Sequence, residues 1–312
     1  MQIWGLDKLT YASNKEALNA QLAANSNYHL INADICSATG MVSAMSEANP
    51  SSIFHLAAES HVDTSIGSPA EFIQTNVIGT YEVLTATQRH YELQSKNHQE
   101  AFRFIHISTD EVYGQLDSHE PGFTESSQYL PNSPYSASKA ASDHLVRAWH
   151  HTYGLPTITT HCSNNYGPYQ HAEKLIPTVI RKALAGEPIP VYGTGKNISD
   201  WIHVDDHADA LMTVLKKGAI GETYNIGGNC ELENLALVKM ICDLLDELHP
   251  QPTSRNNGAS YHDQIRFVTD RPGHDFRYAV DTSKISDELG WQPTRDFEFE
   301  LRNTVDWHVR NA

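Results

Sequence analysis

Short apolar runs rich in β-branched and aromatic residues alternate with helix-length stretches through the first half of the chain. Such alternation predicts βαβ units, because parallel strands need a crossover connection that is usually a helix. We therefore expect an α/β fold built on a doubly wound parallel sheet, with ligands bound at the carboxyl ends of its strands. The predicted strands are 28–33, 52–58, 102–108 and 157–162, and the predicted helices are 38–48, 70 to about 91, and 135–152.

After about residue 164 the alternation becomes less regular, which predicts a smaller α/β lobe that closes over a substrate. We expect a first domain over 1–165 and a mainly substrate-binding lobe over 166–312, with some segments returning to the first domain. The segment 251–260, with Pro, Asn, Gly and Ser, predicts an exposed loop. The lobe's predicted helices are 174–185, 205–217 and 234–248, and its short strands include 189–192 and 223–226.

Composition excludes several classes of partner. The 312 residues include 22 basic and 38 acidic ones, whereas a nucleic-acid-binding surface needs the opposite balance. The four cysteines lack Cys-x-x-Cys spacing, which predicts reduced, mostly buried thiols. The 18 histidines form no metal-binding pattern, so no metal is expected. No apolar run reaches the roughly 20 residues of a membrane span and no signal sequence is recognised, which predicts a cytoplasmic protein without a membrane partner.

Tyr135 and Lys139 form a Tyr-x-x-x-Lys pair at the start of a predicted helix. Residues four apart lie on one helical face, so the ammonium can favour the phenolate and turn the tyrosine into a usable base. The spacing alone is weak evidence, since Tyr11 and Lys15 share it. The residues that precede the helix distinguish Tyr135 from Tyr11.

The run Thr109-Asp110-Glu111 directly follows the predicted strand 102–108. Two adjacent carboxylates beside a hydroxyl suit acid–base chemistry, because like charges this close can leave one group protonated and the other ionised. A Thr or Asp followed by Glu is also typical of a helix N-terminus. From spacing alone the two interpretations are evenly balanced.

The arrangement resembles the extended short-chain dehydrogenase/reductases that act on nucleotide sugars, and among them the 4,6-dehydratases, which carry an acidic pair after this Thr. The resemblance implies a Rossmann-like domain with NAD as cofactor and a redox-neutral loss of water from the sugar. Further matches run in order over nearly the whole chain, at 7–12 (DKLTYA), 55–63 (HLAAESHVD), 163–168 (SNNYGP), 174–177 (KLIP) and 270–274 (DRPGH).

The resemblance also implies a role for each catalytic residue. Tyr135 takes the proton of the sugar 4-hydroxyl while the nicotinamide takes hydride from C4. Thr109 hydrogen-bonds that oxygen, and Lys139 holds the ribose. Glu111 then removes the C5 proton and Asp110 protonates the leaving 6-hydroxyl. Hydride returns to C6, which gives a 4-keto-6-deoxy sugar.

Cofactor and substrate contacts follow by family position. Asp7 would bind the adenosine ribose and Asp34 would flank the adenine, although a turn residue and a helix cap are the respective alternatives. Plain close packing is the alternative for Ala57 and Ala58, and stabilisation of loops is the alternative for the substrate set. The implied NAD contacts are Asp7, Lys8, Leu9, Thr10, Asp34, Ile35, Leu56, Ala57, Ala58, Ser60, Thr75, Tyr135, Lys139 and Asn165. The implied substrate contacts are Ser60, Thr109, Asn164, Lys174, Leu175, Ile176, Pro177, Pro190, Val191, Tyr192, Asn234, Asp270, Arg271, Pro272, Gly273 and His274.

Two features depart from the family. No Gly-rich turn follows an opening strand, so the first βα unit of the fold is not recognised in the sequence. Three explanations are open: a shortened form of a normal enzyme, a degenerate homologue without NAD, or residues 1–6 pairing in the vacant position. Ser199 stands where the family usually carries an Arg that clamps the substrate diphosphate, which predicts weaker substrate binding. Lys196 and Arg271 are the cations that could compensate in part.

The resemblance favours dTDP-glucose as the substrate, with CDP- and GDP-glucose as near alternatives. A UDP-sugar 4-epimerase or decarboxylase of the same fold is a second hypothesis, although an epimerase needs no acid pair after the Thr. A non-catalytic truncated homologue is the third. Relatives are generally homodimers, which predicts a homodimer through the helices 70–91 and 135–152.

Overall fold

The computed structural model describes residues 2–250 and 260–311, which form two compact units. Unit 1 takes in the chain as far as Val112 together with Ser133–His161 and Val214–Tyr224, and unit 2 takes in the rest. The domain division at residue 165 stays a prediction, and the predicted loop 251–260 lies outside the described residues apart from Ser260. Within the described ranges no helix is long and apolar enough to cross a membrane.

Unit 1 alternates between strand and helix. Its elements are β1 (Ile3–Asp7), α1 (Lys15–Ala24), β2 (Tyr28–Asn32), α2 (Ala38–Ala48), β3 (Ser52–His55), α3 (Val62–Gly67), α4 (Pro69–Phe72), the π-helix η1 (Ile73–Gly79), α5 (Thr80–Glu92), α6 (Lys96–Ala101), β4 (Arg103–Thr109), α7 (Pro134–Tyr153) and β5 (Thr157–Cys162). Four elements span residues of both units: the 3-10 helix η2 (Asp110–Tyr113), β5, α9 (Val204–Lys217) and β9 (Thr223–Ile226).

Two sheets carry these elements. β1 pairs in parallel with β2, from Ile3 opposite Tyr28 to Asp7 opposite Asn32. The other sheet has the order β3-β4-β5-β9, with β3 parallel to β4. Among the described residues β1 pairs with β2 and with no other strand, so the suggested pairing of residues 1–6 in a vacant central position is not found.

Two predicted elements of unit 1 have the wrong extent. The strand predicted over 52–58 ends at His55, because the chain leaves the sheet there and Leu56 becomes 57% exposed. The helix predicted over 70–91 consists of α4, η1 and α5. In its π-helical part Asn76 Oδ1 accepts from Glu59 N–H at 2.8 Å, and Asn76 Nδ2 donates to the Glu59 carbonyl at 2.9 Å and to Ser138 Oγ at 2.8 Å. The periodicity of apolar residues carries no information about such tertiary contacts. It therefore predicts one continuous α-helix and misses the π-helical part.

The limits of α7 are encoded locally. Ser133 Oγ accepts from Ser136 N–H and Ser136 Oγ accepts from Ser133 N–H, both at 3.0 Å, which makes a capping box. Pro134 occupies the first turn, where its missing N–H costs nothing. The helix ends at Gly154, whose φ of 71° suits glycine. These signals fix where Tyr135 enters the structure.

Unit 2 contains two small groups of strands and six helices or helical turns among its described residues. They are β6 (Asn164–Tyr166), α8 (Leu175–Ala185), β7 (Ile189–Tyr192), β8 (Ile198–His203), α9 (Val204–Lys217), β10 (Glu231–Glu233), α10 (Asn234–Leu248), the 3-10 helix η3 (Tyr261–Gln264), β11 (Ile265–Val268), β12 (Arg277–Tyr278), α12 (Ser283–Leu289) and α13 (Phe297–Arg310). β8 lies between β10 and β12 and also pairs with β6, while β11 runs parallel to β7. The predicted helices and strands of this half are confirmed, whereas α12 and α13 were not anticipated.

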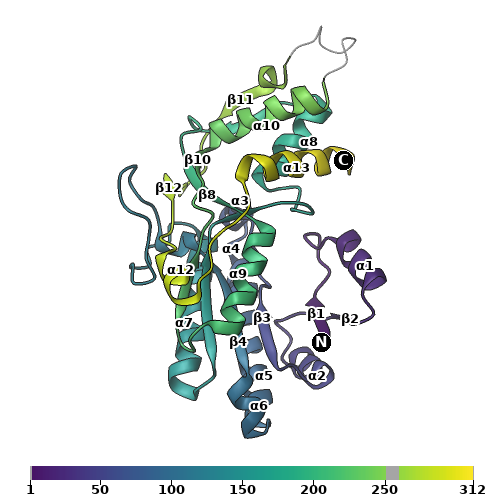
Figure 1. The fold of residues 1–312 in the computed structure, drawn as a ribbon, viewed down its shortest axis with the longest axis vertical. Helices are drawn as coiled ribbons and strands as arrows, with labels where there is room; N and C mark the ends of the chain where they lie inside the picture. Colours follow the sequence, from purple (N-terminus) through teal and green to yellow (C-terminus); the bar gives the residue numbers. More distant parts are fainter. Residues whose placement is uncertain (1, 251–259, 312) are drawn as a thin grey trace. The chain divides into compact units, whose positions relative to one another are not determined.

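Each unit has its own hydrophobic core. In unit 1 α2, α5, β4 and α7 contribute it, with Leu84, Phe104 and Val146 fully buried. In unit 2 the helices α8, α10 and α13 pack on one another (Figure 1) around side chains such as Ile176 and Leu245.

All four cysteines are free thiols, as predicted. The expectation that most of them are buried is wrong, because only Cys242, inside α10, is buried. The other three lie where strands end or loops begin, and they are half-buried: Cys36, Cys162 and Cys230.

Candidate active site

Thr109, Asp110 and Glu111 lie where β4 ends and η2 begins. Thr109 Oγ1 accepts from Glu111 N–H at 3.3 Å and donates to Asp110 Oδ1 at 3.3 Å. The hydroxyl thus caps a short 3-10 turn, so the cap interpretation is correct and is compatible with a chemical role. Thr109 and Asp110 are 7% and 2% exposed, and Glu111 is half-buried. The turn therefore places two carboxylates side by side at the carboxyl end of a buried strand.

Tyr135 and Lys139 lie in the first turns of α7, and both are buried. Lys139 Nζ donates to the carbonyl of Ile107 in β4 at 2.8 Å. The Tyr135 ring packs edge-on against Phe72 of α4, with ring centroids 6.3 Å apart. Lys139 is thereby tied to the strand that carries the Thr and the acid pair, and all five predicted catalytic residues belong to unit 1.

A buried polar cluster, which the sequence analysis missed, adjoins Lys139. The Asp143 carboxylate of α7 accepts hydrogen bonds from His106 Nε2 and His161 Nε2, both at 3.0 Å, and from Ser108 Oγ at 2.9 Å. All four side chains are buried. The available signal was an acidic residue one turn after Lys139, together with polar residues at alternate positions of an otherwise apolar strand.

Burial and hydrogen bonding together fix the charge states of two members of this cluster, His106 and Asp143. Burial and the nearby Lys139 ammonium lower the pKa of His106 to about 4, so its imidazole is neutral at pH 7. Burial raises the pKa of Asp143, but the hydrogen bonds from His106 and His161 outweigh it and hold that pKa well below its usual range. Asp143 is therefore an ionised carboxylate inside the protein.

Asp7 ends β1 and holds the turn that follows. Its Oδ1 accepts from Leu9 N–H at 2.5 Å and from Ser13 Oγ at 2.7 Å, and Leu9 takes a φ of 56°. Asp7 therefore stabilises this turn, a role that is compatible with a contact to the cofactor ribose. Thr10 lies within the same turn, where its hydroxyl accepts from Ala12 N–H at 3.3 Å.

Lys8 and Asp34 form an ion pair of 2.7 Å at the carboxyl ends of β1 and β2. Burial raises the pKa of Asp34, but the hydrogen bond from Lys8 and that from Cys36 N–H lower it below its ordinary value. The alternative that Asp34 caps α2 is wrong, because Ser37 is the N-cap residue. Ile35 is buried in the core of unit 1.

Residues 56–60 follow the carboxyl end of β3, and some of their apolar side chains are exposed to solvent. Leu56 and Ala57 are exposed, Ala58 is half-buried and Ser60 is exposed. Close packing therefore does not account for Ala57. Thr75 lies half-buried in the π-helix, next to the Asn76 that holds the Glu59 backbone.

Asn164 and Asn165 lie on β6 in unit 2. His207 Nδ1 donates to Asn165 Oδ1 at 2.8 Å, and Asn165 Nδ2 donates to the Ser163 carbonyl at 3.1 Å. Burial lowers the pKa of His207 to about 4, so the ring that orients Asn165 is neutral. Sequence reasoning did not identify His207, because only the fold brings α9 beside β6.

The end of β7 and the turn 270–274 come together in unit 2. The rings of Tyr192 and His274 meet edge-on with centroids 6.3 Å apart. His274 Nδ1 donates to Asp270 Oδ1 at 2.6 Å, and the same oxygen accepts from Arg271 N–H at 2.8 Å. Gly273 takes a φ of 66°, which suits glycine, so the turn is held from within.

The remaining predicted substrate residues include side chains that serve the core. Ile176 and Val191 are buried in the core of unit 2 and Pro177 is buried in α8, so their side chains stabilise the fold. Lys174 immediately precedes α8, Leu175 begins it, Pro190 lies in β7 and Asn234 begins α10. Ser199 is 7% exposed on β8, between Leu232 of β10 and Tyr278 of β12.

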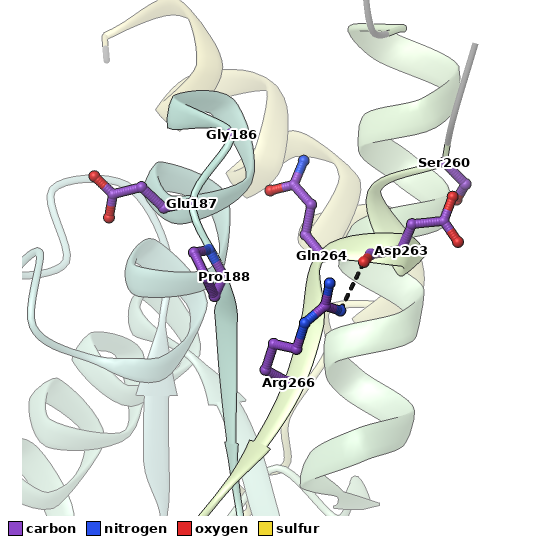
Figure 2. Close-up of a pocket in the computed structure, with 7 residues that line it drawn as sticks. All are labelled: Gly186, Glu187, Pro188, Ser260, Asp263, Gln264 and Arg266. Atoms are coloured by element: carbon purple, nitrogen blue, oxygen red, sulfur yellow. Dashed lines mark hydrogen bonds between the residues drawn. The ribbon is translucent and has the colours of Figure 1, made fainter. Parts of the chain in front are cut away.

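A shallow surface hollow of unit 2 lies outside the predicted site. Figure 2 shows its lining residues, with Arg266 Nη1 donating to the Asp263 carbonyl at 2.8 Å. None of them is a predicted catalytic, cofactor or substrate residue, so the hollow forms no part of the candidate site. They are Gly186, Glu187, Pro188, Ser260, Asp263, Gln264 and Arg266.

The parallel α/β fold, with Tyr135 and Lys139 beside the strand that ends in Thr109, defines the class of extended short-chain dehydrogenase/reductases. The chain belongs to the family whose model is described as GDP-mannose 4,6 dehydratase, which matches residues 1–304.

Individual relatives narrow the comparison. The dTDP-glucose 4,6-dehydratase of Xanthomonas campestris pv. campestris is 54% identical over 312 residues, which is 100% of this chain and 87% of the relative. A dTDP-glucose 4,6-dehydratase of Streptomyces venezuelae, solved with NAD bound, is 41% identical with a TM-score of 0.88, covering 99% of this chain and 88% of that one. A UDP-glucuronic acid 4-epimerase of Bacillus cereus, solved with UDP-glucuronic acid and NAD, is 25% identical with a TM-score of 0.84, covering 100% and 92%.

Proposed function

We propose that this chain is an NAD-dependent dTDP-glucose 4,6-dehydratase, which converts dTDP-glucose into dTDP-4-keto-6-deoxyglucose and water. The observation that carries the proposal is the acid pair Asp110–Glu111, held beside Thr109 at the end of the strand to which Lys139 is hydrogen-bonded. An epimerase needs no such pair. Relatives named for this activity are 52–55% identical over 98–100% of the chain, which supports the choice of nucleotide.

The residues present fit NAD. Asp7 offers a carboxylate at the end of a parallel strand, and Leu56 and Ala57 leave an uncovered apolar strip at the end of another. Such strand ends are where dinucleotides bind in this class of fold. We propose that Asp7, residues 56–58, Thr75, Tyr135 and Lys139 hold the cofactor. When bound, NAD accepts hydride from the sugar and gives it back, so no external oxidant is consumed.

Tyr135, Thr109 and Lys139 serve the oxidation half of the reaction. Tyr135 takes the proton of the 4-hydroxyl, and the Thr109 hydroxyl hydrogen-bonds the same oxygen. The Lys139 ammonium stabilises the phenolate, because a nearby positive charge favours the ionised form of a phenol. Burial of Tyr135 and Lys139 strengthens this interaction, since charges attract more strongly in a low dielectric.

Glu111 and Asp110 serve the elimination half. A ketone at C4 acidifies the C5 proton, which Glu111 removes as general base. Asp110, in its protonated form, donates to the 6-hydroxyl as that group leaves as water. Two carboxylates with different surroundings can divide these roles, and Asp110 is the more buried of the two.

The proposed enzyme is a homodimer through α5 and α7. Ile73 of η1, Tyr81 of α5 and Tyr153 of α7 are 48%, 42% and 52% exposed, which leaves apolar surface uncovered on these helices. Tyr81 of α5 meets Trp149 of α7 edge-on at 5.9 Å, so the apolar face is continuous across both helices. A second copy of the same face is the simplest partner, because an isologous contact is self-complementary.

The proposed function is tested by incubating the purified protein with dTDP-glucose, with and without added NAD, and following the loss of one water by mass spectrometry. We expect product, and a Glu111→Gln variant should lose at least about a hundredfold in kcat because the C5 proton has no base. UDP-glucose serves as the alternative substrate. Absence of product from folded protein supplied with NAD would contradict the proposal. Conversion of UDP-glucose to an isomer of unchanged mass, separated by chromatography, with no loss of water from either substrate, would favour the epimerase alternative.

A further inference from the structure

Three elements of unit 1 converge on one carboxylate. Asp143 belongs to α7, its partners His106 and Ser108 belong to β4, and His161 belongs to β5. The three hydrogen bonds measure 2.9–3.0 Å, and the exposed fractions of the four residues lie between 0% and 4%. Ser108 immediately precedes Thr109, and Asp143 follows Lys139 by one helical turn, so these bonds join the two segments that carry the predicted catalytic residues.

Asp143 of this cluster and the adjoining Lys139 carry opposite charges. The ionised Asp143 and the Lys139 ammonium lie on one face of α7, and both side chains are buried. His106 is neutral, and His55 of β3 stands behind it with ring centroids 5.4 Å apart and a 2.9 Å hydrogen bond to Thr80. A buried ammonium is costly without a nearby negative charge, and Asp143 supplies one.

We infer that Asp143 is a positioning residue for the reaction: it fixes the end of β4 against α7 and supplies the fixed negative charge that balances Lys139. The inference rests on the proposed function, because Tyr135, Lys139 and Thr109 are the groups being positioned. Asp143 itself touches neither substrate nor cofactor in this role.

A purely structural role would produce a different result. Replacing a residue that only stabilises the fold lowers the melting temperature and leaves the ionisation of Tyr135 and Lys139 unchanged. Removing a fixed negative charge lowers the pKa of every nearby titratable group. A neighbouring phenol or carboxyl ionises more easily because its anion is no longer repelled, and a neighbouring ammonium loses its proton more easily because its cation is no longer attracted. The pH dependence of the reaction therefore separates the two roles.

The test compares the parent with Asp143→Asn, by measuring kcat and KM across pH and the melting temperature of each protein. We expect both limbs of the kcat profile to move to lower pH by roughly one unit. We also expect kcat at the optimum to fall roughly tenfold with little change in KM, since misplaced catalytic groups affect the chemical step. Val146→Ala, one turn further along α7, is the control: it should lower the melting temperature and leave the pH profile in place.

Two further measurements keep the inference decidable. Ser108→Ala removes the hydrogen bond to Asp143 but keeps the charge of Asp143, so it should lower kcat without moving the pH profile. An unchanged kcat overturns the positioning role, even where Asp143→Asn is too unstable to assay. A spectroscopic titration of the Tyr135 phenol, taken as the difference from Tyr135→Phe, should shift to lower pH in Asp143→Asn. Superimposable titrations of the folded parent and folded Asp143→Asn overturn the inference, whether or not the parent dehydrates dTDP-glucose. An inactive parent contradicts the proposed function and does not bear on this titration.

Discussion

Single side chains at the end of β4 perform more than one task. The Thr109 hydroxyl accepts from Glu111 N–H and donates to Asp110 Oδ1, so the group proposed to hydrogen-bond the sugar oxygen also shapes the turn. Asn76 similarly holds both backbone groups of Glu59 together with Ser138 Oγ. Polar residues in such positions are individually weak sequence signals, because a cap, a turn and a catalytic group have the same composition.

Ser199 allows a residue-scale prediction. The resemblance to the family predicts a diphosphate-binding cation at its position on β8, and a neutral hydroxyl cannot make a charge-assisted bidentate contact. We expect Ser199→Arg to lower KM for dTDP-glucose roughly tenfold, because a hydrogen bond to a charged group contributes about 1.5–3 kcal/mol.

Ser199 is buried, so size must be separated from charge. Ser199→Met, of similar length but neutral, is the matched control, and it should leave KM unchanged or raise it. Steady-state kinetics of the three proteins, each checked for its melting temperature, make the comparison. An unchanged KM in folded Ser199→Arg would mean that Lys196, Arg271 or another group already neutralises the diphosphate.

At the scale of elements, α7 faces two ways. Its N-terminal turns carry Tyr135, which packs against Phe72 of α4, and Lys139, which donates to β4, while Asp143 also binds β4. Trp149 and Tyr153 near its C-terminus join the exposed apolar face shared with α5. The helix thus connects the candidate active site to the proposed dimer interface.

We expect Tyr81→Glu to convert the proposed dimer into monomers, because a carboxylate buried in an apolar isologous interface would face its own copy without a cation. Sedimentation velocity over a concentration series measures the change. Phe299→Glu, at an exposed aromatic on α13, is the control and should sediment as the parent does. A monomeric parent, or a dimeric Tyr81→Glu, would contradict an interface on α5 and α7.

At the scale of the whole molecule, buried neutral histidines make stability depend on pH. Burial lowers the pKa of His106 and His207 to about 4 and that of His55 well below its ordinary value. Between about pH 6.5 and pH 4 the unfolded chain binds more protons than the folded one. The free energy of unfolding therefore falls as the pH drops through this window. The fall is up to roughly 3 kcal/mol for each histidine that stays neutral in the folded protein throughout the window.

Urea unfolding at a series of pH values measures this slope. His207→Gln, in unit 2, should flatten it between pH 6.5 and 4, because one of the groups that must be deprotonated in the folded state is gone. His98→Gln on α6 removes an exposed histidine and should leave the slope unchanged. Parallel curves for His207→Gln and the parent would exclude a buried neutral His207.

Elements that depend on short-range interactions can be predicted from the order of residues alone. The capping box at Ser133, the glycine after α7 and the apolar strand before Thr109 are local signals, and α7 and β4 follow them closely. The tertiary structure decided what depends on distant neighbours: the π-helix around Asn76, the role of Ser37 rather than Asp34 as the cap of α2, and the exposure of Ala57. It alone brought Asp143 together with His106, Ser108 and His161, because residues up to 37 positions apart meet only once β4, β5 and α7 have packed. Periodicity and spacing report which face of an element is apolar, whereas the partner of a buried polar group is chosen by packing.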